Sequence, residues 1–139
     1  MLTAEKILGA DDIKREKVMV PEWADSDSPQ DIADAFVYVQ GVSGKARDVW
    51  EHSSVSMRMK GRKADVQTNY ANTRAKLLVQ AICDANGKLL FNESQVEQLG
   101  EKSAAPLDRC FEVAQRLSGI SEADIEALTK NSEATASAA

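Results

Sequence analysis

The sequence predicts an α+β fold, in which a small N-terminal antiparallel β-hairpin precedes a mainly α-helical remainder. Two short runs that contain β-branched residues, 15–20 and 36–39, lie in the first third of the chain, and such runs are typical of strands. Beyond residue 44 the apolar residues recur at helical spacing. The chain has 139 residues, of which 43% are hydrophobic, and this suffices for one domain with a packed core.

The first predicted element is a short helix that begins after Thr3 and ends at Gly9. Threonine is a good N-cap, Leu2 and Ile7 have the spacing of a hydrophobic staple, and glycine commonly ends helices. The strand 15–20 follows. It stops at a proline, which has no N–H to donate to a sheet.

The two strands are joined by a long polar connection, 24–35, which contains four aspartates and no basic residue. We predict a mobile, solvated loop here. Three of the aspartates match the first, third and seventh positions of a calcium-binding loop. Pro29 and Phe36, however, stand at the fifth and twelfth positions, where such a loop needs side-chain oxygens. A calcium site is therefore not expected.

Five helices are predicted after the hairpin, because apolar residues recur at helical spacing within 46–57, 66–82, 92–99, 106–117 and 121–128. Asn92 with Gln95, and Ser121 with Asp124, have the spacing of helix-capping pairs. A turn is expected at 84–87 and a helix end at Gly119. The pattern favours a single domain over 1–131. The tail 132–139 contains only small and polar residues and is expected to be disordered.

The two cysteines, Cys83 and Cys110, both lie in apolar stretches. We interpret them as reduced core thiols, since metal sites need more ligands and disulfide frameworks belong mostly to secreted chains. No export signal is visible, and no apolar run approaches the roughly 20 residues of a membrane helix. The sequence therefore favours a cytoplasmic protein.

No residue pattern in the sequence indicates catalysis, a cofactor or a metal. His52 is the sole histidine, and we interpret it as a partly exposed helix residue rather than a catalytic base. The segment 41–45 is faintly similar to a phosphate loop, but Val39 and Ala46 occupy the positions of its first glycine and its Ser or Thr. A strand-to-helix turn explains this segment better. We predict a protein that is not an enzyme.

A basic cluster runs against the overall formal charge of −5, which repels nucleic acid at long range. The cluster lies in the segment 58–76 and comprises Arg58, Lys60, Arg62, Lys63, Arg74 and Lys76. Only one aromatic residue, Tyr70, is interleaved, and no base-reading motif surrounds it. We interpret the cluster as a solvated face or a protein-binding patch, with nucleic acid as the disfavoured alternative.

The order and spacing of these elements resemble the tail assembly chaperones of long-tailed bacteriophages and prophages. The resemblance covers Leu2 to Asn131 and is carried by the Val-Pro-Glu-Trp strand end at 20–23, the helix opening at 44–48, and the turn and helix starts between 84 and 111. It implies a non-enzymatic cytoplasmic protein that binds the tape measure protein, helps tail tube protein to polymerise around it and forms homo-oligomers. The connection 24–35 is longer than the family pattern.

A partner helix needs an apolar or amphipathic surface on which to dock. The candidate partner-binding residues are Trp23, Trp50, Met57, Arg58, Lys60, Arg62 and Lys63. Trp50 and Met57 have helical spacing, which favours core positions over a binding role. Trp23 is equally interpretable as a core residue or a binding residue. Two other functions stay open: a structural component of the virion tail, and a small nucleic-acid-binding regulator that uses the segment 58–76.

Overall fold

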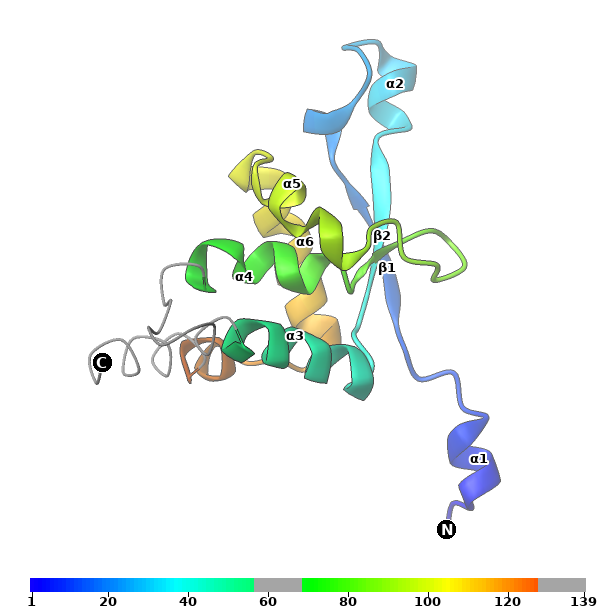
Figure 1. The fold of residues 1–139 in the computed structure, drawn as a ribbon. Coiled ribbons are helices and arrows are strands. Elements are labelled where there is room, and N and C mark those ends of the chain that lie inside the picture. Colours follow the sequence, from blue (N-terminus) through cyan, green and yellow to red (C-terminus); the bar gives the residue numbers. More distant parts are fainter. Residues whose placement is uncertain (57–68, 128–139) are drawn as a thin grey trace, which may run out of the picture.

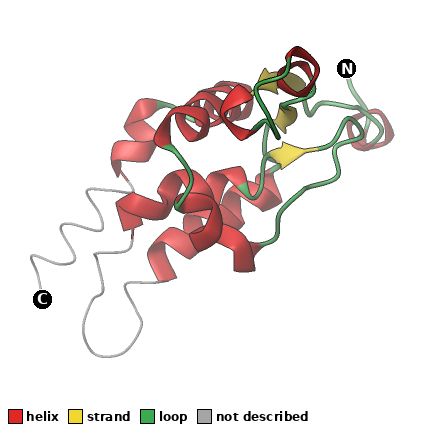
Figure 2. Cartoon of the chain, turned by 90° about the horizontal axis from the view of Figure 1, so that it is seen from above, coloured by secondary structure: helices red, strands yellow, loops and turns green. Residues whose placement is uncertain are grey.

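The computed structural model describes residues 1–56 and 69–127 and has the predicted α+β fold. Its antiparallel sheet has the strand order β1 (Arg15–Met19), β2 (Phe36–Gln40) and β3 (Ile82–Cys83). In both strand pairs Tyr38 marks the register, opposite Lys17 on one side and Cys83 on the other. The larger helices gather on one side of this sheet, and the two views agree on this arrangement (Figures 1 and 2).

The helices largely follow the predicted ranges. They are α1 (Ala4–Leu8), α2 (Pro29–Ala33), α3 (Gly44–Ser56), α4 (Asn69–Leu78), α5 (Val96–Gly100) and α6 (Ala104–Ser118), with short 3-10 helices η1 (Pro21–Trp23) and η3 (Glu93–Gln95). A further helical segment, 122–127, follows α6. The predicted end of the helix through Met57, the residues Val66 and Leu128, and the tail 132–139 lie outside the described residues.

The predicted helix caps are confirmed in atomic detail. The Thr3 hydroxyl accepts a hydrogen bond from the Lys6 N–H at 3.3 Å. Asn92 and Gln95 form a reciprocal capping box, which satisfies backbone donors at a helix start. Gly119 ends α6 with φ of +68°, a left-handed conformation that glycine adopts without strain. These local signals explain why the helices begin and end where the sequence predicts.

The core lies between the sheet and the helices α3, α4 and α6. Side chains with no more than 2% exposure come from strands, helices and the segments that join them: Val20, Val39, Trp50, Ala75, Leu77, Leu78, Val79, Ala81, Ile82, Cys83, Pro106, Cys110 and Ala114. Both cysteines are buried and lie apart from any disulfide, and their predicted core positions are confirmed. α6 packs against β1 and β2 and also against α4, so it links the sheet to the helical layer.

Two sequence predictions are corrected by the structure. The connection 24–35 is not simply a loop, because it contains the helix α2. The Ser28 hydroxyl accepts from the Asp31 N–H at 3.2 Å, and Pro29 occupies the first helical turn, where proline is favoured. The helix predicted to reach Ile82 ends at Leu78.

Ile82 lies instead in β3 because β2 needs a second hydrogen-bonding neighbour. The Gln40 N–H donates to the carbonyl of Ala81 at 3.0 Å, and Val39 is paired with Ile82. Both Val39 and Ile82 are fully buried, and buried backbone groups require partners. Pairing with a strand distant in sequence therefore overrides the local helical periodicity.

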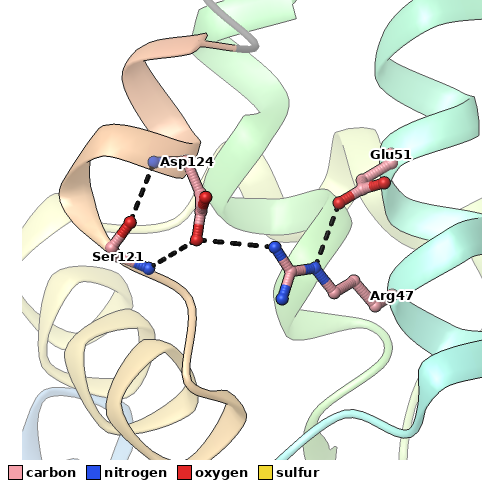
Figure 3. A network of polar contacts seen from close by, with 4 residues as sticks. All are labelled: Arg47, Glu51, Ser121 and Asp124. Carbon is pink, nitrogen blue, oxygen red and sulfur yellow. Dashed lines mark hydrogen bonds and ion pairs between the residues drawn. The ribbon is translucent and has the colours of Figure 1, made fainter.

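A polar network connects α3 to the helical segment 122–127, as Figure 3 shows. Arg47 contacts Glu51 at 3.0 Å on its own helix and Asp124 at 3.4 Å on the other. Asp124 also accepts from the Ser121 N–H at 2.9 Å, while the Ser121 hydroxyl accepts from the Asp124 N–H at 3.1 Å. The predicted cap at Ser121 is confirmed, and Arg47 holds that cap against α3.

Candidate partner-binding site

An apolar groove of about 560 Å³ lies where the end of the first strand meets the α5 region. We call it the Trp23 groove; its lining residues are Trp23, Phe91, Gln95, Gln98, Leu99, Glu101 and Lys102. Leu99 is buried, whereas Trp23 and Phe91 are partly buried and pack against the core. The groove thus has an apolar floor, and its polar rim comes from α5 and the two residues that follow it.

Trp23 is positioned by backbone hydrogen bonds at the tip of the hairpin. The Val20 N–H donates to the Ala35 carbonyl at 2.8 Å, and the Trp23 N–H donates to the Val20 carbonyl at 2.9 Å. The strand therefore turns directly into η1, which the proline at position 21 begins. This turn places the indole over the edge of the core, beside α5.

A single arginine fixes η1 to the helical layer. Arg109 of α6 donates to the Met19 carbonyl at 2.9 Å and to the two carboxylate oxygens of Glu22 at 3.0 and 2.8 Å. The hydrogen bond from Arg109 lowers the pKa of Glu22 to about 2. Glu22 is therefore charged at neutral pH, and the bidentate pair holds the segment that carries Trp23.

The opposite wall of the groove is built by the capping box that the sequence predicts. Phe91 precedes Asn92, whose N–H donates to the Gln95 side chain at 3.0 Å. Phe91 and Val96 are both partly buried against the core, as expected for a hydrophobic staple. The start of α5 is thereby fixed, and Phe91 faces the same groove as Trp23.

This arrangement suits the binding of an amphipathic helix. Aromatic residues at the centre of a groove are frequent anchors of protein interfaces, and a polar rim excludes water around them. The rim carries one acidic and one basic residue, Glu101 and Lys102, which are both exposed. Helix-in-groove recognition needs these two features, an apolar floor and a polar edge.

The structure separates the other sequence candidates. Trp50 is 1% exposed, and its indole N–H donates to the Thr73 carbonyl at 3.2 Å. Of its two interpretations, the core position is the one observed, because the ring fills the space between α3 and α4. Met57, Arg58, Lys60, Arg62 and Lys63 lie outside the described residues. Trp23 is the one candidate that the described part of the chain places in a groove.

Two members of the basic cluster are engaged within the fold. Arg74 forms an ion pair with Asp108 of α6 at 2.7 Å. Lys76 is 6% exposed, and burial lowers its pKa. Lys76 is therefore not exposed for a nucleic-acid phosphate, and Arg74 is half-exposed but already paired.

The residues considered for catalysis are the histidine and the two cysteines. His52 is exposed on α3, and the hydroxyl of neighbouring Ser53 donates to the Trp50 carbonyl at 2.9 Å. Burial raises the pKa of Cys83 and raises that of Cys110 to about 11. Nucleophilic cysteines have the opposite properties, a lowered pKa and exposure to solvent.

Two further findings concern residues 1–56 and 69–127. Within these ranges no group of three or more His, Cys, Asp or Glu side chains is placed to hold a metal ion. The helices of the same ranges include none with the length and apolar character needed to cross a membrane.

Comparisons with known proteins connect this fold to one solved structure. No protein-family model matches the chain, and no curated protein matches its sequence. The structure described as that of the bacteriophage HK97 tail assembly chaperone is similar, with a TM-score of 0.50 and 20% identity over 76% of this chain and 85% of that chain. The α+β architecture is therefore shared with a tail assembly chaperone.

Proposed function

We propose that this protein is a non-enzymatic phage tail assembly chaperone that binds an amphipathic helix of the tape measure protein and assists polymerisation of the tail tube. The observation that carries the proposal is the Trp23 groove on a fold shared with a tail assembly chaperone. The order of elements in the sequence supports the same role. Chaperone activity requires a surface that covers a partner's apolar residues, and it needs no catalytic group.

The Trp23 groove is suited to a segment of the partner protein that is helical rather than extended. Within the described residues, side chains of α6 contact β1, since Arg116 pairs with Glu16 and Arg109 donates to the Met19 carbonyl. An added strand would compete with these contacts. A helix that inserts apolar residues between Trp23 and Phe91 leaves them intact.

The nucleic-acid alternative loses support from the contacts of α4. Arg74 and Lys76, two of the six cations that the regulator would use, are engaged with Asp108 or buried. Phosphate contacts supply most of the affinity of such proteins, so the loss of two cations weakens the case. The structural tail component remains the alternative that detection in purified virions would favour.

Co-expression with the tape measure protein, followed by pull-down, tests the proposal. Trp23→Ala removes the aromatic anchor, and Gln98→Trp fills the groove from an exposed position without removing a core side chain. Both variants are expected to lose the tape measure protein. Ile32→Ala on α2 is the matched control, because Ile32 is 38% exposed and lies outside the groove lining.

The control variant is expected to retain the partner as the wild type does. If Gln98→Trp retains full binding while its thermal unfolding is unchanged, the groove is not the client site. If the wild type captures no tape measure protein, the proposed function is wrong.

A further inference from the structure

The acidic connection 24–35 starts beside the Trp23 groove. Trp23 lines the groove, and Asp25 follows it by two residues, so at most about 7 Å separates their Cα atoms. The Val20 N–H donates to the Ala35 carbonyl at 2.8 Å, which closes the connection at the same tip of the hairpin. Figure 1 shows this tip at the end of the hairpin opposite α1. The carboxylates at the start of the connection therefore extend the polar rim of the groove.

Two of the four aspartates in the connection are held by contacts within it. Asp31 of α2 accepts from the Ser26 hydroxyl at 2.5 Å, and Asp34 accepts from the side-chain amide of the glutamine one turn earlier at 3.0 Å. Asp25 and Asp27 are exposed, and among the described residues no hydrogen bond or ion pair engages their carboxylates. We call residues 25–27 the acidic turn. The contact of Ser26 with α2 fixes this turn, and the two carboxylates that flank Ser26 remain open to a partner.

The negative charge of the acidic turn is not balanced by a neighbouring cation of the described chain. The connection contains no basic residue. Arg109, which holds the adjacent η1, already donates to both carboxylate oxygens of Glu22 and to a backbone carbonyl. On the rim of the groove, Glu101 and Lys102 have opposite charges. The surface beside the apolar floor is therefore negative in excess, and such a surface favours a partner of positive charge.

We propose that the acidic turn selects, for the Trp23 groove, a helix of the tape measure protein that carries Lys or Arg residues beside its apolar face. This inference rests on the proposed function, because it specifies the chemistry of the partner that the same groove takes. A helix with its side chains is about 10 Å across, so a helix seated beside Trp23 brings its flanking side chains to the acidic turn. The aliphatic stems of Lys and Arg cover apolar surface while their charged ends reach the carboxylates.

Overlapping peptides that cover the tape measure protein identify the segments that bind. Each peptide has about 20 residues, long enough for five helical turns. The wild-type chain, labelled with a fluorophore, is incubated with an array of these peptides. The peptides that bind are expected to have a net positive charge and apolar residues at helical spacing. Binding peptides that are neutral or acidic overturn the proposal.

The double variant Asp25→Asn with Asp27→Asn tests the acidic turn itself, since it removes two charges and keeps the size of both side chains. We expect the Kd for a binding peptide, measured by fluorescence anisotropy, to rise about tenfold near 0.05 M salt. Near 1 M salt, where the Debye length is about 3 Å, the rise should be less than about twofold. Thermal unfolding should be unchanged, because neither carboxylate has a contact within the described chain.

The matched control is Asp11→Asn with Asp12→Asn, which changes the net charge by the same amount. These two aspartates are exposed and precede β1, at the other end of the hairpin. The control is expected to bind the peptide as the wild type does at both salt concentrations. An equal loss of affinity in the control would show that only the net charge of the chain acts, and would overturn the proposal.

A charge swap shows whether the contact is direct. Asp25→Lys with Asp27→Lys should bind the basic peptide weakly, and it should bind more tightly a version of the peptide in which the flanking Lys and Arg residues are replaced by Glu. No gain from this replacement contradicts a direct contact and overturns the proposal.

The variant Trp23→Ala separates the failure of this inference from the failure of the proposed function. If Trp23→Ala loses the peptide while Asp25→Asn with Asp27→Asn binds it as the wild type does, the groove takes a helix without selecting a basic one, and this inference alone is wrong. If the wild type binds no peptide of the tape measure protein, the proposed function is wrong and this inference falls with it.

Discussion

The helices α6 and α1 have similar residues at their ends, but α6 has buried side chains and α1 has none. Each follows a Ser or Thr and ends at a glycine. Four residues of α6 are buried, Pro106, Leu107, Cys110 and Ala114, whereas α1 buries none. Similar residues therefore stand at the ends of both helices, but packing decides whether a helix contributes to stability. Apolar residues stabilise the fold in α6, and in α1 they remain available to a partner.

The strongest test of this difference is one substitution made in both helices. Leu107→Ala in α6 removes a side chain that is 5% exposed, and we expect it to cost about 3 kcal/mol through lost burial and a residual cavity. Leu8→Ala in α1 should change the free energy of unfolding by less than about 0.5 kcal/mol. Urea unfolding followed by circular dichroism measures both values. Equal losses would show that α1 packs on the fold.

A second test concerns Trp50, the sequence candidate that the structure places in the core. Trp50→Phe removes the indole hydrogen bond to the Thr73 carbonyl and leaves a smaller ring in a packed site. We expect a loss of about 2 kcal/mol in the free energy of unfolding, with pull-down of the tape measure protein retained. If the Trp50→Phe variant unfolds as the wild type does but no longer binds the tape measure protein, Trp50 is a binding residue rather than a core residue.

The glycines that end α1 and α6 are expected to differ in how much their replacement lowers the free energy of unfolding. Gly119 has φ of +68°, and a Cβ atom there would meet no heavy atom within 4 Å. Gly119→Ala should therefore report backbone strain alone, about 1 kcal/mol. Gly9 ends α1 with φ of −87°, and Gly9→Ala should leave global unfolding unchanged. Thermal or urea unfolding of the two variants side by side checks this expectation.

The smallest expected effect is the pH dependence of the ion pair that joins α6 to η1. Glu22 has a pKa of about 2, below its ordinary value of 4.5, so its contribution to stability is present above the ordinary value and is lost as the pH falls from about 5 towards 2. The urea midpoints of wild type and Glu22→Gln should therefore converge on acidification. Glu5→Gln on α1 is the control and should follow the wild type at every pH. Parallel curves for wild type and Glu22→Gln would show that the pair contributes nothing.

The sequence predicts the elements whose signals are local. The caps at Thr3, Asn92 and Ser121, the antiparallel hairpin and the α6 stripe are all observed. The α2 helix was also signalled, since Ser28 and Pro29 are a favourable cap and first residue, but the aspartate-rich composition of 24–35 favoured a loop. Composition describes exposure well and local backbone conformation poorly.

The candidate site is only partly visible in the sequence. Trp23 lies two residues after Pro21 at the predicted strand end, and the sequence offers it as a candidate binding residue without deciding between core and surface. Its partners Phe91 and Leu99 lie 68 and 76 residues away, and no periodicity connects them to it. They meet because α6 packs on the sheet and Arg109 holds η1 beside α5.

The amino-acid sequence by itself determined the fold class, the chain direction of the hairpin and most helix ends. The helix ends depend on residues within one or two turns of one another, and the fold class and the hairpin follow from the residue pattern within each element. The tertiary structure alone decided that Ile82 and Cys83 form a third strand, that Trp50 is buried while Trp23 lines a groove, and that α1 stays uncovered. These outcomes depend on which distant segments satisfy buried backbone groups and apolar faces, and that competition is settled only when the whole chain packs.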